Sequence, residues 1–322
     1  MLGSDLPSIF FGKNMTNNTL NDTEQAEFQT DNLQRFIFDN APVRGEWLHL
    51  TDTWQQVLVR RDYPAAIQNL LGEMMAAAAL LAATVKIKGR LVLQSKSSGP
   101  VKVMMVECTS DHTLRALAQW DGDIEDAATM NELTGEGVMA ITIDVEGSKQ
   151  PYQGVVSLDG ESISSVLETY FRQSEQLDTR IRLAADAKSV SGLLLQQLPS
   201  LRDDKQEDEE HWSRLSQLAA TITTKELLKL GAGTVLHRLF HQEECRLLSS
   251  TEFSFACSCS RERVANTISL LGEQDANDLL TEQGRIEVAC EFCNQHYYFD
   301  KIDVKKIFSV NTSTHPDSDT VH

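Results

Sequence analysis

The segment that decides the fold spans residues 64–108 and reads PAAIQNLLGEMMAAAALLAATVKIKGRLVLQSKSSGPVKVMMVEC. Its first part, Pro64 to Val85, is rich in Ala, Leu and Met, which are strong helix formers, and it opens with a proline that the first helical turn tolerates. The remainder holds two β-rich runs, residues 89–95 and 101–108, around the turn Ser97-Ser98-Gly99-Pro100. We therefore expect a long helix followed by a β-hairpin.

The residues after this hairpin continue the mixture of strands and helices. Further strands are expected at Thr113–Trp120, Val138–Asp144 and Tyr152–Leu158. Ser162 is the expected N-cap of a helix that reaches Tyr170. These elements predict an α+β fold class, with an N-terminal domain built on an antiparallel sheet.

The composition changes near residue 198. The run LPSLRDDKQEDEEHW, residues 198–212, is densely acidic, and we interpret it as a solvated linker. Two amphipathic helical segments follow, at residues 211–230 and 233–244, separated by Gly231-Ala232-Gly233. Each has an apolar face that needs a partner, and that face could either dock on the first domain or be released.

The bulk composition limits the possible partners and the compartment. The 322 residues carry a formal net charge of -18, which opposes binding to a phosphate backbone, so no nucleic-acid partner is expected. No stretch reaches the roughly 18 to 20 unbroken apolar residues of a spanning helix. The nearest, Met74 to Val85, is expected to be a buried core helix. The N-terminus lacks a basic region before its apolar patch, so we expect no secretory signal and a cytoplasmic protein whose thiols stay reduced.

Four of the six cysteines are grouped near the C-terminus. Cys257-Ser-Cys259 and Cys290-Glu-Phe-Cys293 form two close pairs, the arrangement by which four sulfurs reach one tetrahedral ion, and they predict a Zn²⁺ site. The paired spacing disfavours four unrelated core cysteines. His296 could compete as a ligand, but four thiolates suffice, and we interpret it as a surface histidine.

The local pattern around these cysteines predicts a small module. Helices are expected at about Arg261–Leu271 and Gln274–Thr281, and the segments RIEVAC and HYYFD favour a hairpin knuckle. The isolated cysteines, Cys108 and Cys245, are expected to be small buried hydrophobic residues.

The same four thiols could form a redox switch. Zinc keeps them as thiolates, the form that an oxidant attacks, and neighbouring sulfurs allow the disulfides Cys257–Cys259 and Cys290–Cys293 to form. Zinc would then leave, and a module of about 55 residues that depends on metal would lose most of its stability. The amphipathic segment between residues 212 and 245 could then come loose.

Several segments of the chain resemble one known family, the 33-kDa heat-shock chaperonins, which are redox-regulated holdases of the bacterial cytosol. The resemblance covers about residues 31–308, and no catalytic residue is expected. It is carried by Arg44-Gly45 and by the segments at residues 63–94, 99–111, 152–156 (YQGVV), 170–179 (YFRQSEQLDT), 192–199, 237–244, 255–274 (FACSCSRERVANTISLLGEQ) and 288–300 (VACEFCNQHYYFD).

The resemblance implies a domain organisation. It gives an N-terminal chaperone and dimerisation domain at 31–203, a metastable helical linker at 204–252, and a C-terminal zinc-binding redox-switch module at 253–308. Residues 1–30 and 309–322 are expected to be disordered tails.

The resemblance also implies an activity. Cys257, Cys259, Cys290 and Cys293 would be the zinc ligands and the redox-active pairs. Oxidation would unfold the linker, expose a surface for unfolded client proteins and favour a homodimer. The family needs no ATP, and this chain contains no GxxxxGK[ST] phosphate loop.

Three alternatives remain open from the residues alone. A thiol-disulfide oxidoreductase could use Cys290 and Cys293, but it would need that pair at the start of a helix. A nucleic-acid-binding zinc ribbon could use the small basic patch of Arg261 and Arg263, against the net charge. The third is a structural zinc site on an unrelated binding protein. Catalysis at Ser174-Glu175-Gln176 is disfavoured, since no histidine is suitably placed and a helix terminus explains the motif.

Overall fold

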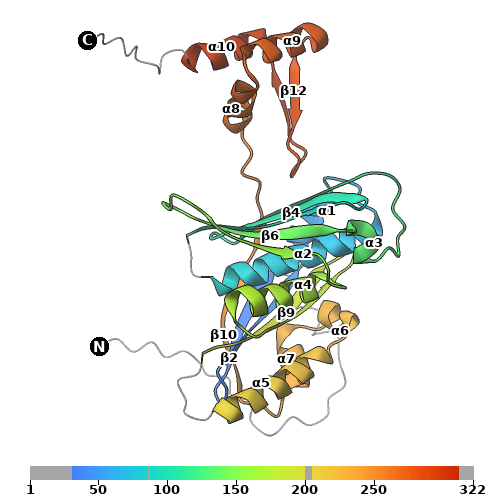
Figure 1. The fold of residues 1–322 in the computed structure, drawn as a ribbon, viewed down its shortest axis with the longest axis vertical. Helices are drawn as coiled ribbons and strands as arrows, with labels where there is room; N and C mark the ends of the chain where they lie inside the picture. The colour runs from blue at the N-terminus through green and yellow to red at the C-terminus, as the bar shows by residue number, and fades with distance from the viewer. Residues whose placement is uncertain (1–30, 86–87, 200–204, 312–322) are drawn as a thin grey trace, which may run out of the picture. The chain divides into compact units, whose positions relative to one another are not determined.

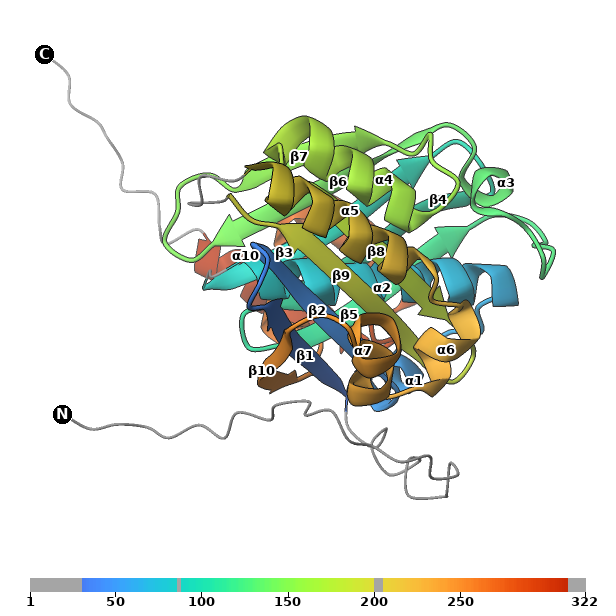
Figure 2. The same cartoon turned by 90° about the horizontal axis from the view of Figure 1, so that it is seen from below.

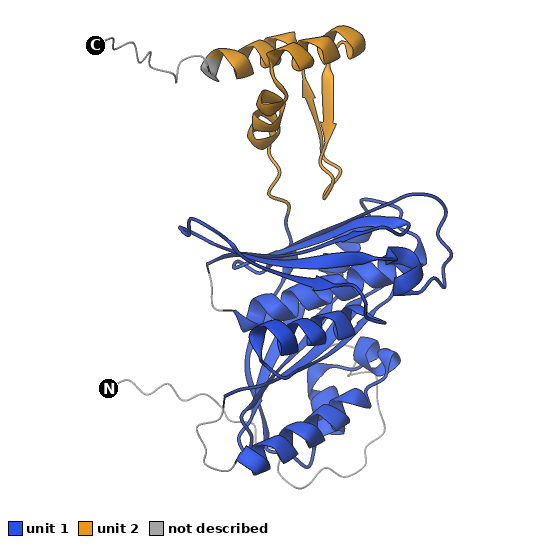
Figure 3. Ribbon diagram, viewed as in Figure 1, with its two compact units in different colours: residues 1–256 blue, residues 257–322 orange. Residues whose placement is uncertain are grey.

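The computed structural model describes residues 31–85, 88–199 and 205–311. They form two compact units, residues 1–256 and 257–322 (Figure 3). The predicted tail at 1–30 and residues 312–322 of the predicted C-terminal tail lie outside the described residues. Residues 309–311, assigned to that tail from the sequence, instead form the end of a helix.

The first unit contains two β-sheets rather than the single sheet that the sequence suggests. Neighbouring strands pair antiparallel, except for the parallel pair β11–β5. The five-stranded sheet has the order β10-β1-β2-β9-β8, with β1 Asn32–Phe38, β2 Val43–Leu50, β8 Thr179–Ala185, β9 Val190–Gln197 and β10 Cys245–Glu252. The six-stranded sheet has the order β11-β5-β4-β3-β6-β7, with β3 Gly89–Ser97, β4 Val101–Thr109, β5 Thr113–Trp120, β6 Gly137–Val145, β7 Tyr152–Ser157 and β11 Ser254–Phe255.

The helix α2, Ala65–Thr84, lies between the two sheets and packs against strands of both (Figure 1). This confirms the long helix predicted from residue 64, with Pro64 as its N-cap. A Cβ on Gly72 would lie 2.6 Å from the side chain of Ala185, so glycine permits this close packing on the five-stranded sheet. By length and composition alone α2 could cross a membrane, but 72% of its most apolar window is buried inside the protein. It is the core helix.

Short helices complete the first unit. They are α1 Asp52–Leu58, α3 Met130–Thr134 and α4 Ile163–Tyr170, which a π-helical turn, Phe171–Glu175, extends. The Ser162 hydroxyl accepts a hydrogen bond from the Ser165 amide, which confirms the predicted cap. The Glu175 carboxylate accepts hydrogen bonds from the hydroxyls of Tyr152 and Tyr170, both at 2.7 Å. Ser174-Glu175-Gln176 therefore ends a helix, as expected.

Three helices, α5 Lys205–Ala220, α6 Thr224–Lys229 and α7 Ala232–Phe240, cover the outer face of the five-stranded sheet (Figure 2). Two sequence interpretations are corrected here. Residues 205–212 of the acidic run are mostly exposed, as a solvated stretch should be, but they are helical. The predicted helix at 211–230 is interrupted after Ala220, since Thr223 caps a new helix. The segment 241–244 ends the helical region and leads into β10, a strand that the sequence did not predict.

The second unit contains α8 Arg261–Leu271, α9 Glu273–Gln283, the hairpin β12 Ile286–Ala289 and β13 His296–Phe299, and α10 Lys301–Asn311. Both predicted helices and the predicted hairpin are confirmed, whereas α10 was not predicted. Among the described residues its fully buried core has five members, Ile268, Ala276, Ile286, Phe299 and Val304. The unit therefore has little apolar burial of its own.

Candidate metal centre

Two short backbone segments of the second unit carry the four clustered cysteines. Cys257 and Cys259 precede α8, whose first turn is capped by the Ser260 hydroxyl. Cys290 and Cys293 lie in the turn that joins β12 to β13. The Cys290 amide donates to Gln295 and its carbonyl accepts from Asn294, which has a positive φ of 56°. This tight turn points both cysteines of the second pair to one side.

The four cysteine sulfurs form one cluster, and all of them lie within 4.8 Å of one another. The Sγ atoms of Cys257 and Cys290 are 3.7 Å apart, and those of Cys259 and Cys293 are 3.3 Å apart. The structure thus brings together two pairs that are separated by thirty residues in the sequence.

This donor set fits a tetrahedral zinc ion. With Zn–S bonds of about 2.3 Å, the edges of a tetrahedron of sulfurs measure about 3.8 Å. The measured separations of 3.7 and 3.3 Å lie slightly below that edge length, and all four residues are partly buried. Four soft sulfur donors without a carboxylate ligand favour zinc over magnesium or calcium.

The immediate surroundings of the cluster add one donor. The Tyr297 hydroxyl donates to the Cys259 sulfur at 3.1 Å, and this hydrogen bond raises the pKa of Tyr297 to about 12. Burial raises the pKa of Cys290 and of Cys293, so nearby positive charge would be needed to hold them as thiolates. The contact of Tyr297 with the cluster was not predicted. The only feature of the sequence that could have indicated it is the position of Tyr297 four residues after Cys293.

The other polar side chains of this unit are used in structural contacts. His296 lies outside the sulfur cluster and its Nδ1 is 2.8 Å from a carboxylate oxygen of Glu287, an interaction that lowers the pKa of Glu287. Arg261 pairs with Asp303 at 2.7 Å and lies over the ring of Phe299, 4.4 Å from its centroid. Half of the suspected basic patch is therefore neutralised.

The two isolated cysteines are not part of the sulfur cluster. Cys108 is buried in the core around α2, and Cys245 is partly buried against the apolar side chains below α5–α7. Burial raises the pKa of each to about 12. Both fit the predicted role of small hydrophobic residues.

Comparison with known proteins identifies relatives along nearly the whole chain. The family model described as Hsp33 protein matches residues 31–300. The 33 kDa chaperonin of Nitrosococcus oceani is 46% identical over 279 residues, which cover 87% of this chain and 94% of that protein. The 33 kDa chaperonin of Pseudomonas fluorescens strain SBW25 is 47% identical over 297 residues, 91% of this chain and 98% of that protein.

A solved structure supports the fold. The crystal structure of the 33 kDa chaperonin (heat shock protein 33 homolog) of Thermotoga maritima matches with a TM-score of 0.77 and covers 88% of this chain and 100% of that one, at 21% identity. The fold, the cysteine cluster and these relatives define the class: this is a molecular chaperone, a protein that binds unfolded clients. The chain belongs to the Hsp33 family.

Proposed function

We propose that this chaperone is an ATP-independent holdase whose activity is controlled by zinc and by the oxidation of Cys257, Cys259, Cys290 and Cys293. The observation that carries the proposal is the cluster of four sulfurs within 4.8 Å in a unit whose fully buried core has only five described members. A fold with so small a core depends on its cross-links.

In the reduced protein the four cysteines hold zinc and fix the second unit. Bound zinc supplies a positive charge that keeps all four sulfurs as thiolates. Cys257 and Cys259 anchor the start of α8, and Cys290 and Cys293 anchor the β12–β13 turn. Tyr297 supports Cys259 through its hydroxyl. The four side chains thereby join the start of α8 to the β12–β13 turn.

Oxidation removes these ligands in pairs. A cysteine sulfur attacks hydrogen peroxide, the O–O bond breaks, and a sulfenic acid and one water result. The neighbouring thiol then attacks that sulfur, an S–S bond forms and a second water leaves, so that two thiols and one peroxide give one disulfide and two waters.

We propose the pairs Cys257–Cys259 and Cys290–Cys293. Cross-pairs such as Cys259 with Cys293 are also close in the folded unit, at 3.3 Å. However, partners only two or three residues apart stay neighbours after the unit unfolds, whereas cross-pairs separate. Peptide mapping of the oxidised protein would distinguish the two pairings.

A short stretch of chain connects the cysteines to the three helices of the first unit. Directly before Cys257, Phe255 of β11 pairs with β5 and lies under the guanidinium of Arg60, 4.0 Å from its ring centroid. Phe253 is buried in the core around α2, and β10 pairs along β1. Loss of order at Cys257 would therefore fray β11 first, then free Phe253 and weaken β10, to which α7 is joined.

The helices α5–α7 are the segment that we propose to be metastable, within the linker at 204–252. Their apolar side chains, including Leu215, Leu236 and Phe240, are buried on the outer face of the five-stranded sheet. Asp208 is also buried there, and neither of its carboxylate oxygens has a hydrogen-bond partner among the described residues. Such an unpaired buried group costs about 1 to 3 kcal/mol and weakens the docking. Release would expose both the helices and the sheet face to clients.

The remaining parts of the proposal follow the family. We place the protein in the cytoplasm, assign residues 31–203 to the chaperone and dimerisation domain and 253–308 to the redox-switch module, and expect a homodimer after oxidation. We assign it no enzymatic reaction, and no nucleic-acid or membrane partner. The Cys290–Cys293 pair lies in a hairpin turn rather than at a helix start, which disfavours an oxidoreductase.

A peroxide titration at mildly raised temperature tests the function. Zinc release, thiol content and suppression of the aggregation of a heat-unfolded client are followed in the same samples. We expect the reduced protein to contain one zinc and to suppress aggregation poorly, and the oxidised protein to have lost zinc and to suppress it well. Full activity in the reduced, zinc-loaded protein would contradict the proposal.

A further inference from the structure

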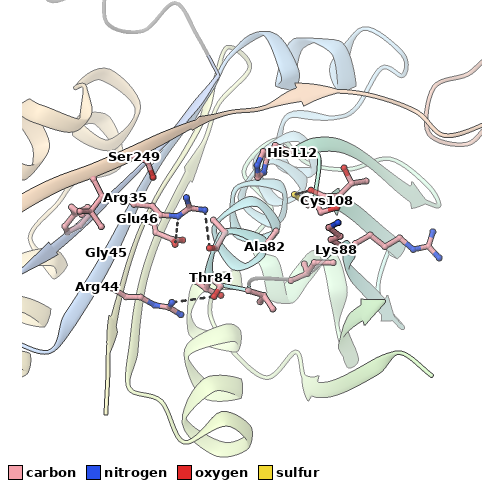
Figure 4. A pocket seen from close by; sticks show the side chains of 18 of the residues that line it. Arg35, Arg44, Gly45, Glu46, Ala82, Thr84, Lys88, Cys108, His112 and Ser249 are labelled. Atoms are coloured by element: carbon pink, nitrogen blue, oxygen red, sulfur yellow. Dashed lines mark hydrogen bonds and ion pairs between the residues drawn. The ribbon is translucent and has the colours of Figure 1, made fainter. Parts of the chain in front are cut away.

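A pocket of about 740 Å³ lies in the first unit, at the C-terminal end of α2 between the two sheets (Figure 4). Arg35, Arg44 and Glu46 extend into it from β1 and β2, and Lys88 and His112 lie across from them. None of the four clustered cysteines lines it. The pocket is therefore independent of the zinc site.

The charge of the pocket is opposite to that of the chain. Among the described residues, its lining includes four basic residues, Arg35, Arg44, Lys88 and Arg90, and one acidic residue, Glu46. The whole chain has 29 Lys and Arg against 47 Asp and Glu. A concave basic surface on an acidic protein concentrates anions locally.

Two of these cations form no ion pair with a carboxylate of the described residues. Arg44 donates to the side-chain oxygen of Gln196 at 2.6 Å and to the carbonyl of Thr84 at 3.5 Å, and no carboxylate of the described chain lies within 4.0 Å of it. Lys88 is exposed and likewise forms no ion pair with any described residue. By contrast, Arg90 is paired with Asp144 at 2.9 Å. The positive charges of Arg44 and Lys88 are thus available to bind an anion.

The one acidic residue also has unused hydrogen-bonding capacity. Glu46 is 2% exposed, its Oε1 lies 3.8 Å from Arg35, and its Oε2 has no hydrogen-bond partner among the described residues. Burial raises the pKa of Glu46 to about 7, against the lowering effect of the two arginines. A protonated Glu46 could donate a hydrogen bond to a ligand oxygen.

We propose that this pocket binds a small oxyanion, either a phosphate ester or a carboxylate, between Arg35, Arg44 and Lys88. Arginine and lysine form short charge-assisted hydrogen bonds with such groups, and arginine can do so with two parallel donors. The volume leaves room for an organic group larger than the anion itself. A simpler account gives the arginines only a structural role, since Arg35 and Arg44 also donate to the last carbonyls of α2.

Isothermal titration calorimetry on the reduced, zinc-loaded full chain tests the proposal, with inorganic phosphate, glycerol 3-phosphate and succinate as separate probes at constant ionic strength. We expect at least one probe to bind with a Kd below about 1 mM. Lys88→Gln should weaken that binding by about tenfold or more, since it removes a charged hydrogen-bond partner. Lys149→Gln, which removes the same charge from an exposed turn outside the pocket, should leave it unchanged.

The outcomes separate the two accounts. A phosphate ester bound more tightly than succinate identifies the phosphate class, and the reverse order identifies carboxylates. Arg44→Lys should bind with intermediate affinity, since it keeps the charge but loses the forked donor. The proposal fails if no probe binds at 10 mM, or if Lys149→Gln weakens binding as much as Lys88→Gln. It also fails if Arg44→Gln lowers the melting temperature and leaves the Kd unchanged.

Discussion

The two units differ most in how much apolar surface they bury. Among the described residues, the core around α2 contains 43 buried members, with 17 more below α5–α7, whereas the second unit has five. A core of the first kind stabilises a domain without help. A core of the second kind does not, and four cysteines lie where a metal would complete it. We therefore expect that the second unit can unfold while the core around α2 stays folded.

Removing the metal should produce the largest contrast between the units. When a strong chelator is added to the reduced protein, we expect the second unit to unfold, because zinc binding contributes on the order of 10 kcal/mol to such folds. The core around α2 in the first unit should keep its structure, whereas α5–α7 should loosen. Hydrogen exchange read peptide by peptide should show lost protection at residues 261–311 and retained protection at α2. Equal loss of protection at α2 would contradict the contrast between the two units.

Substituting one ligand should have the next largest effect. Cys259→Ser replaces a thiolate with a weak hydroxyl ligand, and we expect zinc affinity to fall by more than about a hundredfold, beyond what the loss of a supporting contact costs. Cys245→Ser is the matched control, since Cys245 lies in the first unit and is not one of the four clustered cysteines. Competition with a chromophoric chelator measures both affinities. Unaltered affinity in Cys259→Ser would exclude Cys259 as a ligand.

Weakening the packing of α5–α7 on the five-stranded sheet should activate the protein without oxidation of the cysteines. Phe240→Ala deletes a ring that is 1% exposed and packs edge-on against Phe38, and such deletions cost about 3 to 5 kcal/mol. We expect the variant to suppress client aggregation without oxidant while it still holds zinc.

Phe171→Ala is the matched control, because Phe171 belongs to the core around α2. It should lower the stability of the first unit as a whole without selective exposure of α5–α7. If both variants activate the reduced protein equally, docking of α5–α7 is not what controls activity.

Glu46→Gln should change how the stability of the first unit depends on pH, and leave the second unit unaffected. Burial raises the pKa of Glu46 from 4.5 to about 7, with Arg35 and Arg44 facing it and Lys88 and His112 lining the same pocket. The unfolded chain therefore loses this proton first. The contribution of Glu46 is fully present below pH 4.5, falls as the pH rises to about 7, and is constant above that value.

The size of that change is on the order of 2 to 3 kcal/mol. Glu46→Gln should gain stability relative to the parent as the pH rises from 5 to 8, and urea unfolding at these two pH values measures the difference. The same stability difference at both pH values would show that Glu46 is not the titrating group.

The smallest expected effect is a loss of zinc affinity when the hydrogen bond that supports Cys259 is removed. Tyr297→Phe removes the hydroxyl that donates to the Cys259 sulfur at 3.1 Å. Loss of such a contact typically weakens metal binding by about 10- to 100-fold. Tyr298→Phe is the control, because no hydrogen bond from its hydroxyl to a cysteine is found in the described chain. Equal zinc affinities in the two variants would show that Tyr297 does not support the site.

The sequence predicted local features well and long-range ones poorly. The helix α2, the strands β3 to β7 and the Ser162 cap follow from patterns within a few residues. Two local hairpins, β1–β2 and β8–β9, were missed in the sequence. The strand β10 could not be predicted because its pairing is long-range: Phe38 of β1 pairs with Cys245 of β10. The acidic charge of residues 205–211 suggested a solvated linker; the stretch is mostly exposed but helical, and Asp208 is its one buried member.

In the candidate site too, a local sequence pattern was predictive and contacts between distant segments were not. The spacing of the four cysteines predicted their meeting, since two close pairs are a recognisable pattern. Tyr297 could not be predicted in the same way, because its contact with Cys259 depends on how the hairpin folds toward α8. The basic pocket could not be predicted either, since Arg35, Arg44, Lys88 and Glu46 come from three separate segments of the first unit.

The most direct test follows hydrogen exchange at residues 205–240 while peroxide removes the zinc. We predict that these amides lose their protection in step with zinc release, and that α2 stays protected throughout. Reduction and added zinc should restore the original pattern. If zinc leaves and residues 205–240 keep full protection, the proposed link between the cysteine cluster and the docked helices is wrong.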